Sequence, residues 1–226
     1  MTESDPQQFA TAGPFEATWR ATPGRFPPIQ AFEQVASAND LEAVMALEGW
    51  TDDRLVRHRL YRLPRDQWVF GRPNASVIMA AFLHASPEGS RFADAALGAW
   101  YASLAETTAI KEVAHHLRRE VIRSGRPDIV SQYLSYQARL AGTYVDIRGL
   151  KMQAAMLYRP DDYAAGQAFG ARVRASDRAG IVYDSVRDLT GINVVAFRPP
   201  AVLDVVQGRQ LELTVRPAGK IVVRLL

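Results

Sequence analysis

The stretch "GAWYASLAETTAIKEVAHH", from Gly98 to His116, decides how the chain folds. It begins as an apolar strand and turns directly into an amphipathic helix that is predicted to end near Gly125. In the strand, Tyr101 and Ser103 share one face and Trp100 takes the other, because successive strand side chains alternate. In the helix, apolar residues recur at three- and four-residue spacing and form a stripe that faces a core. The stripe consists of Ala109, Ile110, Val113, Ala114, Leu117 and Val121.

Glu112 lies on the flank of this apolar stripe. A carboxylate at the margin of a core has to be solvated, paired or functional, because burying an unpaired charge is costly. Its neighbours one helical turn away are Thr108 and His116, and neither is a permanent cation. Spacing alone therefore leaves two interpretations open, an exposed helix charge or a functional carboxylate.

Outside this stretch, helices and short strands mix without the regular order of βαβ units. Helices are predicted over 38–50 with Asn39 as the cap, over 75–85, and over 163–176 with Asp161 or Asp162 as the cap. Strands are predicted within 133–147, 180–188, 192–197, 202–206, 211–216 and 220–225. This mixture predicts a single α+β domain.

The domain is expected to span residues 15–226, after a polar, flexible segment over residues 1–14. The N-terminus has no apolar signal-peptide core, and no apolar run is long enough to span a membrane. No membrane association is expected, and the absence of cysteine fits a cytoplasmic protein.

Composition and missing motifs exclude several function classes. The chain has no cysteine, no phosphate-binding P-loop, no G-x-S-x-G elbow and no dinucleotide-binding glycine fingerprint. His115 and His116 are adjacent and point about 100° apart on a helix, so they do not chelate one metal, and surface or capping positions are expected for them. No metal site is predicted. The 27 basic and 24 acidic residues are scattered, which argues against nucleic-acid binding, although the pI of about 9.3 keeps a nucleic-acid-binding or RNA-cleaving protein as an alternative.

Three segments resemble a known family. "SRFADAALGAWYASLAETTAIKEVAHH" (90–116) resembles the signature of the RES domain family, the toxin halves of bacterial toxin–antitoxin pairs. "GIVYDSVRD" (180–188) resembles the family's later Gly-x-x-Tyr-x-Ser element, and "WRATPGRFPPI" (19–29) resembles its leading Arg segment. The three matches occur in the family's order and cover residues 18–200.

The resemblance implies a fold like that of the ADP-ribosyltransferases, in which a split antiparallel sheet with flanking helices surrounds an NAD cleft. It also implies the site residues, which are Arg20, Arg91, Tyr101, Glu112 and Ser185. Ala21 follows the leading arginine, where some members have an aromatic residue, and Arg25 is the competing candidate for that arginine.

The chemistry of NAD cleavage explains what these residue types would do. Breaking the nicotinamide–ribose bond builds positive charge on the sugar, as in glycosidases. Nicotinamide leaves as a neutral ring, so one carboxylate suffices, and Glu112 would bond the ribose 2′-hydroxyl and stabilise the cation. Tyr101 is expected to act beside it, while Arg20 and Arg91 offer fork-shaped cations to the pyrophosphate and Ser185 a hydroxyl.

The resemblance therefore implies an NAD-consuming toxin of a type II toxin–antitoxin system, which arrests growth by phosphorolysis or hydrolysis of NAD. NAD would be the substrate, and no resident cofactor is expected. The implied partner is an antitoxin protein with a helix-turn-helix portion, and a homodimer is left open. The alternative within the family is a mono-ADP-ribosyltransferase that modifies a host protein.

Overall fold

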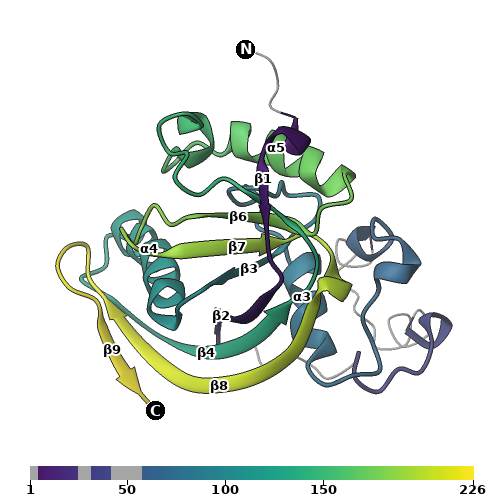
Figure 1. Cartoon of the computed structure of the whole chain (residues 1–226). Helices are drawn as coiled ribbons and strands as arrows, with labels where there is room; N and C mark the ends of the chain where they lie inside the picture. Colours follow the sequence, from purple (N-terminus) through teal and green to yellow (C-terminus); the bar gives the residue numbers. More distant parts are fainter. Residues whose placement is uncertain (1–4, 25–31, 42–57) are drawn as a thin grey trace.

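The computed structural model describes residues 5–24, 32–41 and 58–226, and within these residues nine strands form one sheet (Figure 1). The strands are β1 (Ala10–Ala12), β2 (Phe15–Pro23), β3 (Trp100–Ser103), β4 (Ile129–Leu140), β5 (Tyr144–Asp146), β6 (Gly180–Asp184), β7 (Ile192–Ala196), β8 (Val202–Val215) and β9 (Val222–Leu225). The helices are α3 (Ala75–Leu83), α4 (Glu106–Ser124) and α5 (Ala164–Ala175), with short 3-10 turns η1 (Pro6–Gln8), η2 (Arg65–Gln67), η3 (Ala155–Tyr158) and η4 (Pro199–Ala201).

The sheet divides into two halves that meet at a single residue pair. The strand order is β1-β5-β6-β7-β3-β2-β4-β8-β9, in which β5 and β6 are parallel and the other neighbours are antiparallel. Between β3 and β2 only Trp19 and Ser103 pair, whereas β2 follows β4 along most of its length. The predicted α+β fold with a split antiparallel sheet is therefore confirmed.

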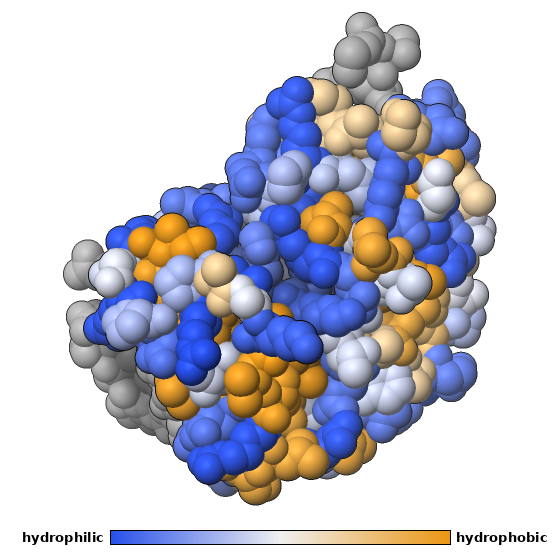
Figure 2. Space-filling view, turned by 90° about the vertical axis from the view of Figure 1, so that its left-hand side faces the viewer, coloured by the Kyte–Doolittle hydropathy of each residue, from blue (hydrophilic) through white to orange (hydrophobic). Residues whose placement is uncertain are grey.

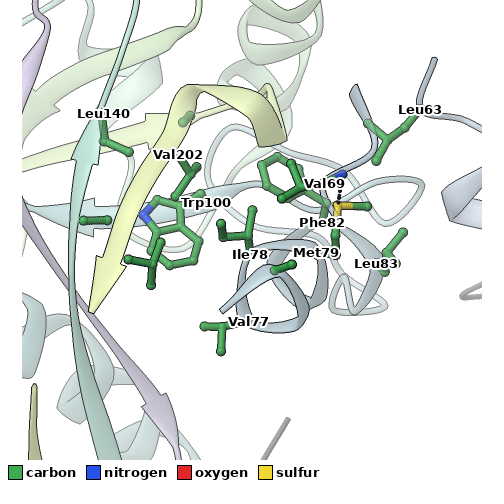
Figure 3. Packing of buried hydrophobic residues seen from close by; sticks show 14 of the residues in the cluster. Leu63, Val69, Val77, Ile78, Met79, Phe82, Leu83, Trp100, Leu140 and Val202 are labelled. Atoms are coloured by element: carbon green, nitrogen blue, oxygen red, sulfur yellow. Dashed lines mark hydrogen bonds between the residues drawn. The ribbon is translucent and has the colours of Figure 1, made fainter. Parts of the chain in front are cut away.

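Three hydrophobic clusters hold helices on this sheet. The largest packs α3 against Trp100 of β3, with Leu140 beyond the indole and Val202 close to it (Figure 3). The second packs Phe169 of α5 on β6 and β7. The third packs the stripe of α4 on the long antiparallel pair β4 and β8, where Tyr133 is buried. The stripe expected in the opening stretch is the face that α4 uses, because its members are buried or partly buried and four of them, Ile110, Val113, Ala114 and Leu117, belong to this cluster.

Two glycines let α5 approach the chain that precedes β3. A Cβ on Gly166 would lie 2.2 Å from the carbonyl oxygen of Arg91, and one on Gly170 would lie 1.9 Å from that of Phe92. No side chain fits at either distance, so the helix backbone rests directly on this segment. The packing of α5 therefore fixes where Arg91 lies.

Most predicted elements are present, with changed boundaries. The helices expected over 75–85 and 163–176 are α3 and α5, and α4 ends before Gly125, which has a left-handed φ of 65°. The strands expected over 202–206 and 211–216 are one continuous strand, β8, because it pairs with the long strand β4. Residues 42–57, which include most of the helix expected over 38–50, lie outside the described residues.

Two predictions near the N-terminus need correction. The segment expected to be flexible over 1–14 instead forms η1 and β1 in its described part, because Phe9 stacks edge-on against Phe169 at 5.3 Å and β1 pairs with β5. In the helix expected over 38–50, Asn39 is not the cap. The Ser37 hydroxyl accepts from the backbone N–H of Asp40 at 3.2 Å, which places the cap two residues earlier.

Candidate active site

A cleft of about 310 Å³ opens where the two half-sheets diverge. Its walls come from β2, from β3, from α4 and from the segment 89–91, which α5 supports. The view of the side that lies at the left of Figure 1 shows a hollow near the centre of the molecule, bordered mainly by hydrophilic residues (Figure 2). The split therefore leaves an open recess, lined by charged, polar and aromatic side chains, rather than a closed core.

Glu112 extends from α4 to line this cleft, and described residues donate hydrogen bonds to only one of its two carboxylate oxygens. Its Oε1 accepts a hydrogen bond from the Ser185 hydroxyl at 2.6 Å and another from the Asn193 amide at 2.6 Å. Within the described part of the chain, no residue donates to Oε2. Glu112 is thus neither an exposed helix charge nor half of an ion pair, and the arrangement presents one carboxylate oxygen to the cleft.

The α4 helix that carries Glu112 is anchored at its first turns. The Asp188 carboxylate accepts from the Thr108 hydroxyl at 2.8 Å and pairs with Lys111 at 2.8 Å. Asp188 follows β6 by four residues, so these contacts tie α4 to the β6–β7 connection. They restrain Glu112 relative to the strands that bond its carboxylate.

Tyr101 points from β3 toward the segment 89–91. Its hydroxyl oxygen accepts from the backbone N–H of Phe92 at 2.9 Å and lies 2.8 Å from the Ser90 hydroxyl. Burial raises the pKa of this phenol, so the group stays protonated at neutral pH. Tyr101 lines the cleft and brings an aromatic ring and a neutral hydroxyl to it.

Arg91 is buried and lies across the cleft wall beneath Tyr163. Its Nη1 donates to the carbonyl oxygens of Leu157 at 3.1 Å and Arg159 at 2.7 Å. Its guanidinium stacks 5.1 Å from the centre of the Tyr163 ring. These two backbone carbonyl oxygens hold Nη1 of the guanidinium group. The planar group therefore lines the cleft in a fixed orientation.

Arg20 of β2 connects this strand to β3, next to the single residue pair that joins the two strands. Its Nη1 donates to the carbonyl oxygen of Tyr101 at 3.0 Å, and its guanidinium lies 5.0 Å from the Trp100 ring centre. Burial lowers the pKa of Arg20 to about 10, which leaves it charged at neutral pH. Its Nε is buried without a partner in the described structure. Arg20 therefore joins the half-sheets and also presents a cation to the cleft.

The two adjacent histidines lie on the cleft rim rather than at a helix end. His115 and His116 both line the cleft from the middle of α4, with ring centres 5.7 Å apart. Burial, together with the positive charge of Arg187, lowers the pKa of His115 to about 4, so this ring is neutral at pH 7. Of the surface or capping positions expected for them, His116 has the surface position, His115 is half-buried, and neither caps the helix, because α4 continues for two further turns.

Four of the five site residues expected from the sequence line one cleft. These are Arg20, Arg91, Tyr101 and Glu112. Arg25, the alternative to Arg20, lies outside the described residues.

Ser185 is placed differently from the expectation that it contacts NAD. Its side chain is buried behind Glu112, where the hydroxyl accepts from the backbone N–H groups of Arg187 at 3.0 Å and Asp188 at 2.9 Å and donates to Glu112. The single hydroxyl proton is used, so it is not free for a phosphate or an amide.

Asn193 is the site residue that the sequence analysis missed. It lies in β7 opposite Ser103 of β3, in a run that reads as an ordinary apolar strand. A single asparagine among apolar neighbours was the one available signal, and only the pairing of β3 with β7 brings it to Glu112.

Within residues 5–24, 32–41 and 58–226, no cluster of three or more His, Asp or Glu side chains is arranged to hold a metal ion. No helix among these residues combines the length and the apolar character that a membrane crossing requires.

The fold and the site together define an α+β domain in which Glu112 and three arginines, Arg20, Arg91 and Arg187, line a cleft at a split sheet. The sequence matches the RES domain family over residues 59–216, and the chain belongs to this family. Among solved structures, a chain in the crystal structure of the M. tuberculosis MbcT-MbcA toxin-antitoxin complex is similar, with 12% sequence identity and a TM-score of 0.48 over 91% of each chain. A comparison with curated proteins finds no match.

Proposed function

We propose that this RES domain protein cleaves the bond between nicotinamide and ribose in NAD. The observation that carries the proposal is the state of Glu112, which lines the cleft together with Arg20 and Arg91. Its Oε1 accepts from two donors, whereas no described residue donates to its Oε2. A carboxylate held this way is suited to stabilising a cation that forms only during the reaction.

The reaction needs no general acid. When the C1′–N bond breaks, its electron pair goes to the ring nitrogen, so the cationic pyridinium leaves as neutral nicotinamide. The positive charge moves to the ribose, where Glu112 stabilises it and accepts a hydrogen bond from the 2′-hydroxyl. Water or phosphate then attacks C1′, and water loses its proton to solvent as ADP-ribose forms.

The remaining cleft residues match the other parts of the substrate. The guanidinium groups of Arg20 and Arg91 offer N–H donors in the planar geometry that suits phosphate oxygens. The Tyr101 ring offers a face for nicotinamide, and its protonated hydroxyl offers a bond to the ribose. In this assignment the Ser185 hydroxyl donates its hydrogen bond to the Glu112 carboxylate and does not contact the substrate.

The proposed activity is tested with the purified chain and NAD, with and without inorganic phosphate, by determining the masses of the products. Release of nicotinamide together with ADP-ribose identifies water as the acceptor, and a phosphorylated ADP-ribose identifies phosphate. A mass increase on an added protein identifies the ADP-ribosyltransferase alternative. Unchanged NAD in all mixtures, together with salt-sensitive binding to an oligonucleotide, would contradict the proposal in favour of a nucleic-acid-binding protein.

The biological role that we propose is that of a toxin restrained by an antitoxin protein. Membership of the RES family supports this role, and a cell that makes an NAD-cleaving enzyme requires a restraint on it. The arginines in the cleft would attract an acidic or C-terminal carboxylate segment of the partner, which carries a helix-turn-helix portion. Expression of the chain alone should arrest growth, and co-expression with the product of the adjacent gene should restore it. Growth arrest that persists under co-expression would contradict the partner.

A further inference from the structure

A continuous chain of side-chain hydrogen bonds leads away from Glu112 into the sheet. Glu112 Oε1 accepts from the Asn193 amide at 2.6 Å, and the Asn193 carbonyl oxygen accepts from the Ser103 hydroxyl at 2.7 Å. Ser103 and Asn193 face each other as a cross-strand pair of β3 and β7, and both are buried. Side chains of β7 and β3 therefore support the Glu112 carboxylate, Asn193 directly and Ser103 through Asn193.

The orientation of the Asn193 amide follows from the chemistry of its neighbours. A carboxylate only accepts hydrogen bonds, so the group of Asn193 that faces Glu112 must be the NH₂. The amide oxygen then faces Ser103, whose hydroxyl is a donor. The carboxylate thus fixes the orientation of the amide, and the Ser103 hydroxyl, by donating to the amide oxygen, stabilises the rotamer that donates to Glu112.

A purely structural role explains Asn193 poorly. Its strand neighbours Ile192, Val194 and Val195 are apolar, and an apolar residue at this position would avoid the cost of burying an amide. The amide is instead directed at the one carboxylate that faces the cleft. Its cost is offset only because Glu112 and Ser103 satisfy it, so the three residues depend on one another.

We infer that Asn193, oriented by Ser103, is a positioning residue that aims Glu112 at the reacting sugar. This inference rests on the proposed NAD cleavage. Two donors on Oε1, from Asn193 and Ser185, fix the rotation of the carboxylate and leave Oε2 directed into the cleft. Without Asn193 the carboxylate turns about its single remaining side-chain bond, and the geometry that matches the transition state is populated less.

The test is a double-mutant cycle on NAD turnover with Asn193→Ala, Glu112→Gln and the combined variant. Asn193→Ala should lower kcat by about 10- to 100-fold, because a small displacement of a catalytic group has effects of this size. KM should change by less than about twofold, because a positioning residue acts through Glu112 and not through a contact of its own with NAD. In the Glu112→Gln background, Asn193→Ala should lower kcat by less than about threefold, because the group that it positions is already disabled.

A milder variant keeps the inference testable if Asn193→Ala does not fold. Ser103→Ala leaves Asn193 in place but frees its amide to rotate, so kcat should fall by about 3- to 10-fold with KM unchanged. Ser135→Ala is the matched control, because Ser135 is also a buried strand serine, but its oxygen accepts from the backbone N–H of Arg209 and not from this network. The control should keep the kcat of the wild type. Melting curves of all variants distinguish a loss of folding from a loss of the carboxylate orientation of Glu112.

The outcomes distinguish this inference from the proposed function. If the wild-type chain does not cleave NAD, the proposed function fails. If the wild type cleaves NAD and the kcat of Asn193→Ala and Ser103→Ala matches that of Ser135→Ala, the function stands and the positioning role is refuted. Equal losses of kcat from Asn193→Ala in both backgrounds would also refute it, since a role independent of Glu112 would then explain the loss.

Discussion

The two walls of the cleft are held in place by different kinds of partner. The carboxylate wall carries Glu112, whose fixed oxygen is bonded by two side chains. The arginine wall carries Arg91 and Arg20, whose fixed nitrogens donate to backbone carbonyl oxygens and whose guanidinium groups stack on aromatic rings. In each wall one part of the polar group is bound by the protein and another part reaches the cleft.

This difference predicts how each wall responds to substitution. Side-chain partners can be removed singly without moving the backbone, so the carboxylate wall should lose function while the fold survives. Backbone partners move only when the fold moves, so defects in the arginine wall should combine weaker binding with lower stability. The predictions that follow challenge this contrast, from the largest expected effect to the smallest.

Substitution of the carboxylate itself should have the largest effect. Glu112→Gln keeps the shape of the side chain and its helix propensity but removes the negative charge. NAD turnover should fall by about 10²- to 10³-fold, the scale seen when one preorganised electrostatic group is removed. Steady-state assays of nicotinamide release measure the loss, and a melting curve that matches the wild type shows that the fold is intact. Near-normal turnover would mean that Glu112 is a structural residue.

Removal of the buried arginine should weaken NAD binding. Arg91→Ala deletes a charge-assisted contact worth about 1.5–3 kcal/mol, which corresponds to an increase in Kd of roughly 10- to 150-fold. Because Arg91 also bonds the carbonyl oxygens of Leu157 and Arg159, the melting temperature should fall as well. Calorimetric titration with NAD measures the affinity. Arg139→Ala is the control, since Arg139 is an exposed arginine that pairs with Asp204 and does not line the cleft. Equal affinities of the two variants would remove Arg91 from the site.

A substitution in α5 should disturb the arginine wall without touching the cleft. Gly170→Val places a side chain where only 1.9 Å separates a Cβ from the carbonyl oxygen of Phe92, next to Arg91. Overpacking of this kind costs about 1–3 kcal/mol, or roughly 2–12 °C in melting temperature for a domain of this size. Ala168→Val on the exposed face of α5 is the control for the helix propensity of valine. If both variants melt at the same temperature, the close packing of α5 does not support this wall.

The smallest effect concerns the pH dependence of stability at the cleft rim. The pKa of His115 is lowered from 6.5 to about 4 by burial, with Arg187, His116 and Arg119 adding to the effect and Asp161 opposing it. As the pH falls through 6.5, the unfolded chain takes up a proton that the folded chain does not. The contribution of His115 to the free energy of unfolding should therefore decrease from pH 6.5 toward pH 4 and level off below.

His115→Gln removes this titration, so its melting temperature should fall less than that of the wild type across the same window. Above pH 7.5 both proteins carry a neutral side chain here, and the difference between their melting temperatures should no longer vary with pH. Parallel curves for the two proteins from pH 8 to pH 4 would contradict the buried, neutral state of His115.

The sequence predicted the fold where local pattern determines the structure. The stripe of α4, the stop at Gly125 and the short apolar strands β6 and β7 follow from periodicity, composition and turn chemistry. The break between 202–206 and 211–216 was wrong, because polar residues in the middle of β8 read as a turn, while its pairing with the long β4 keeps the strand continuous. The N-terminal segment was taken as flexible because the contact of Phe9 with α5 spans 160 residues of sequence and leaves no local signal.

The site was predicted in part for a related reason. Glu112, Tyr101 and Arg91 lie in one continuous stretch, so the motif carries them together. Ser185 was found but given a substrate contact, because a motif does not show that its hydroxyl proton is already used. Asn193 was missed since its role depends on the register of β7 against β3, which no local pattern encodes.

One measurement tests the contrast between the two walls most directly. Single-turnover cleavage of NAD is followed over a range of protein concentrations for the wild type, Glu112→Gln and Arg91→Ala. At saturation, Glu112→Gln should cleave about 10²- to 10³-fold more slowly with a half-saturating concentration close to that of the wild type. Arg91→Ala should approach the wild-type rate but saturate at a concentration roughly 10- to 150-fold higher. If both variants lose the same parameter in the same proportion, the division into a carboxylate that stabilises the transition state and an arginine wall that binds the substrate is wrong.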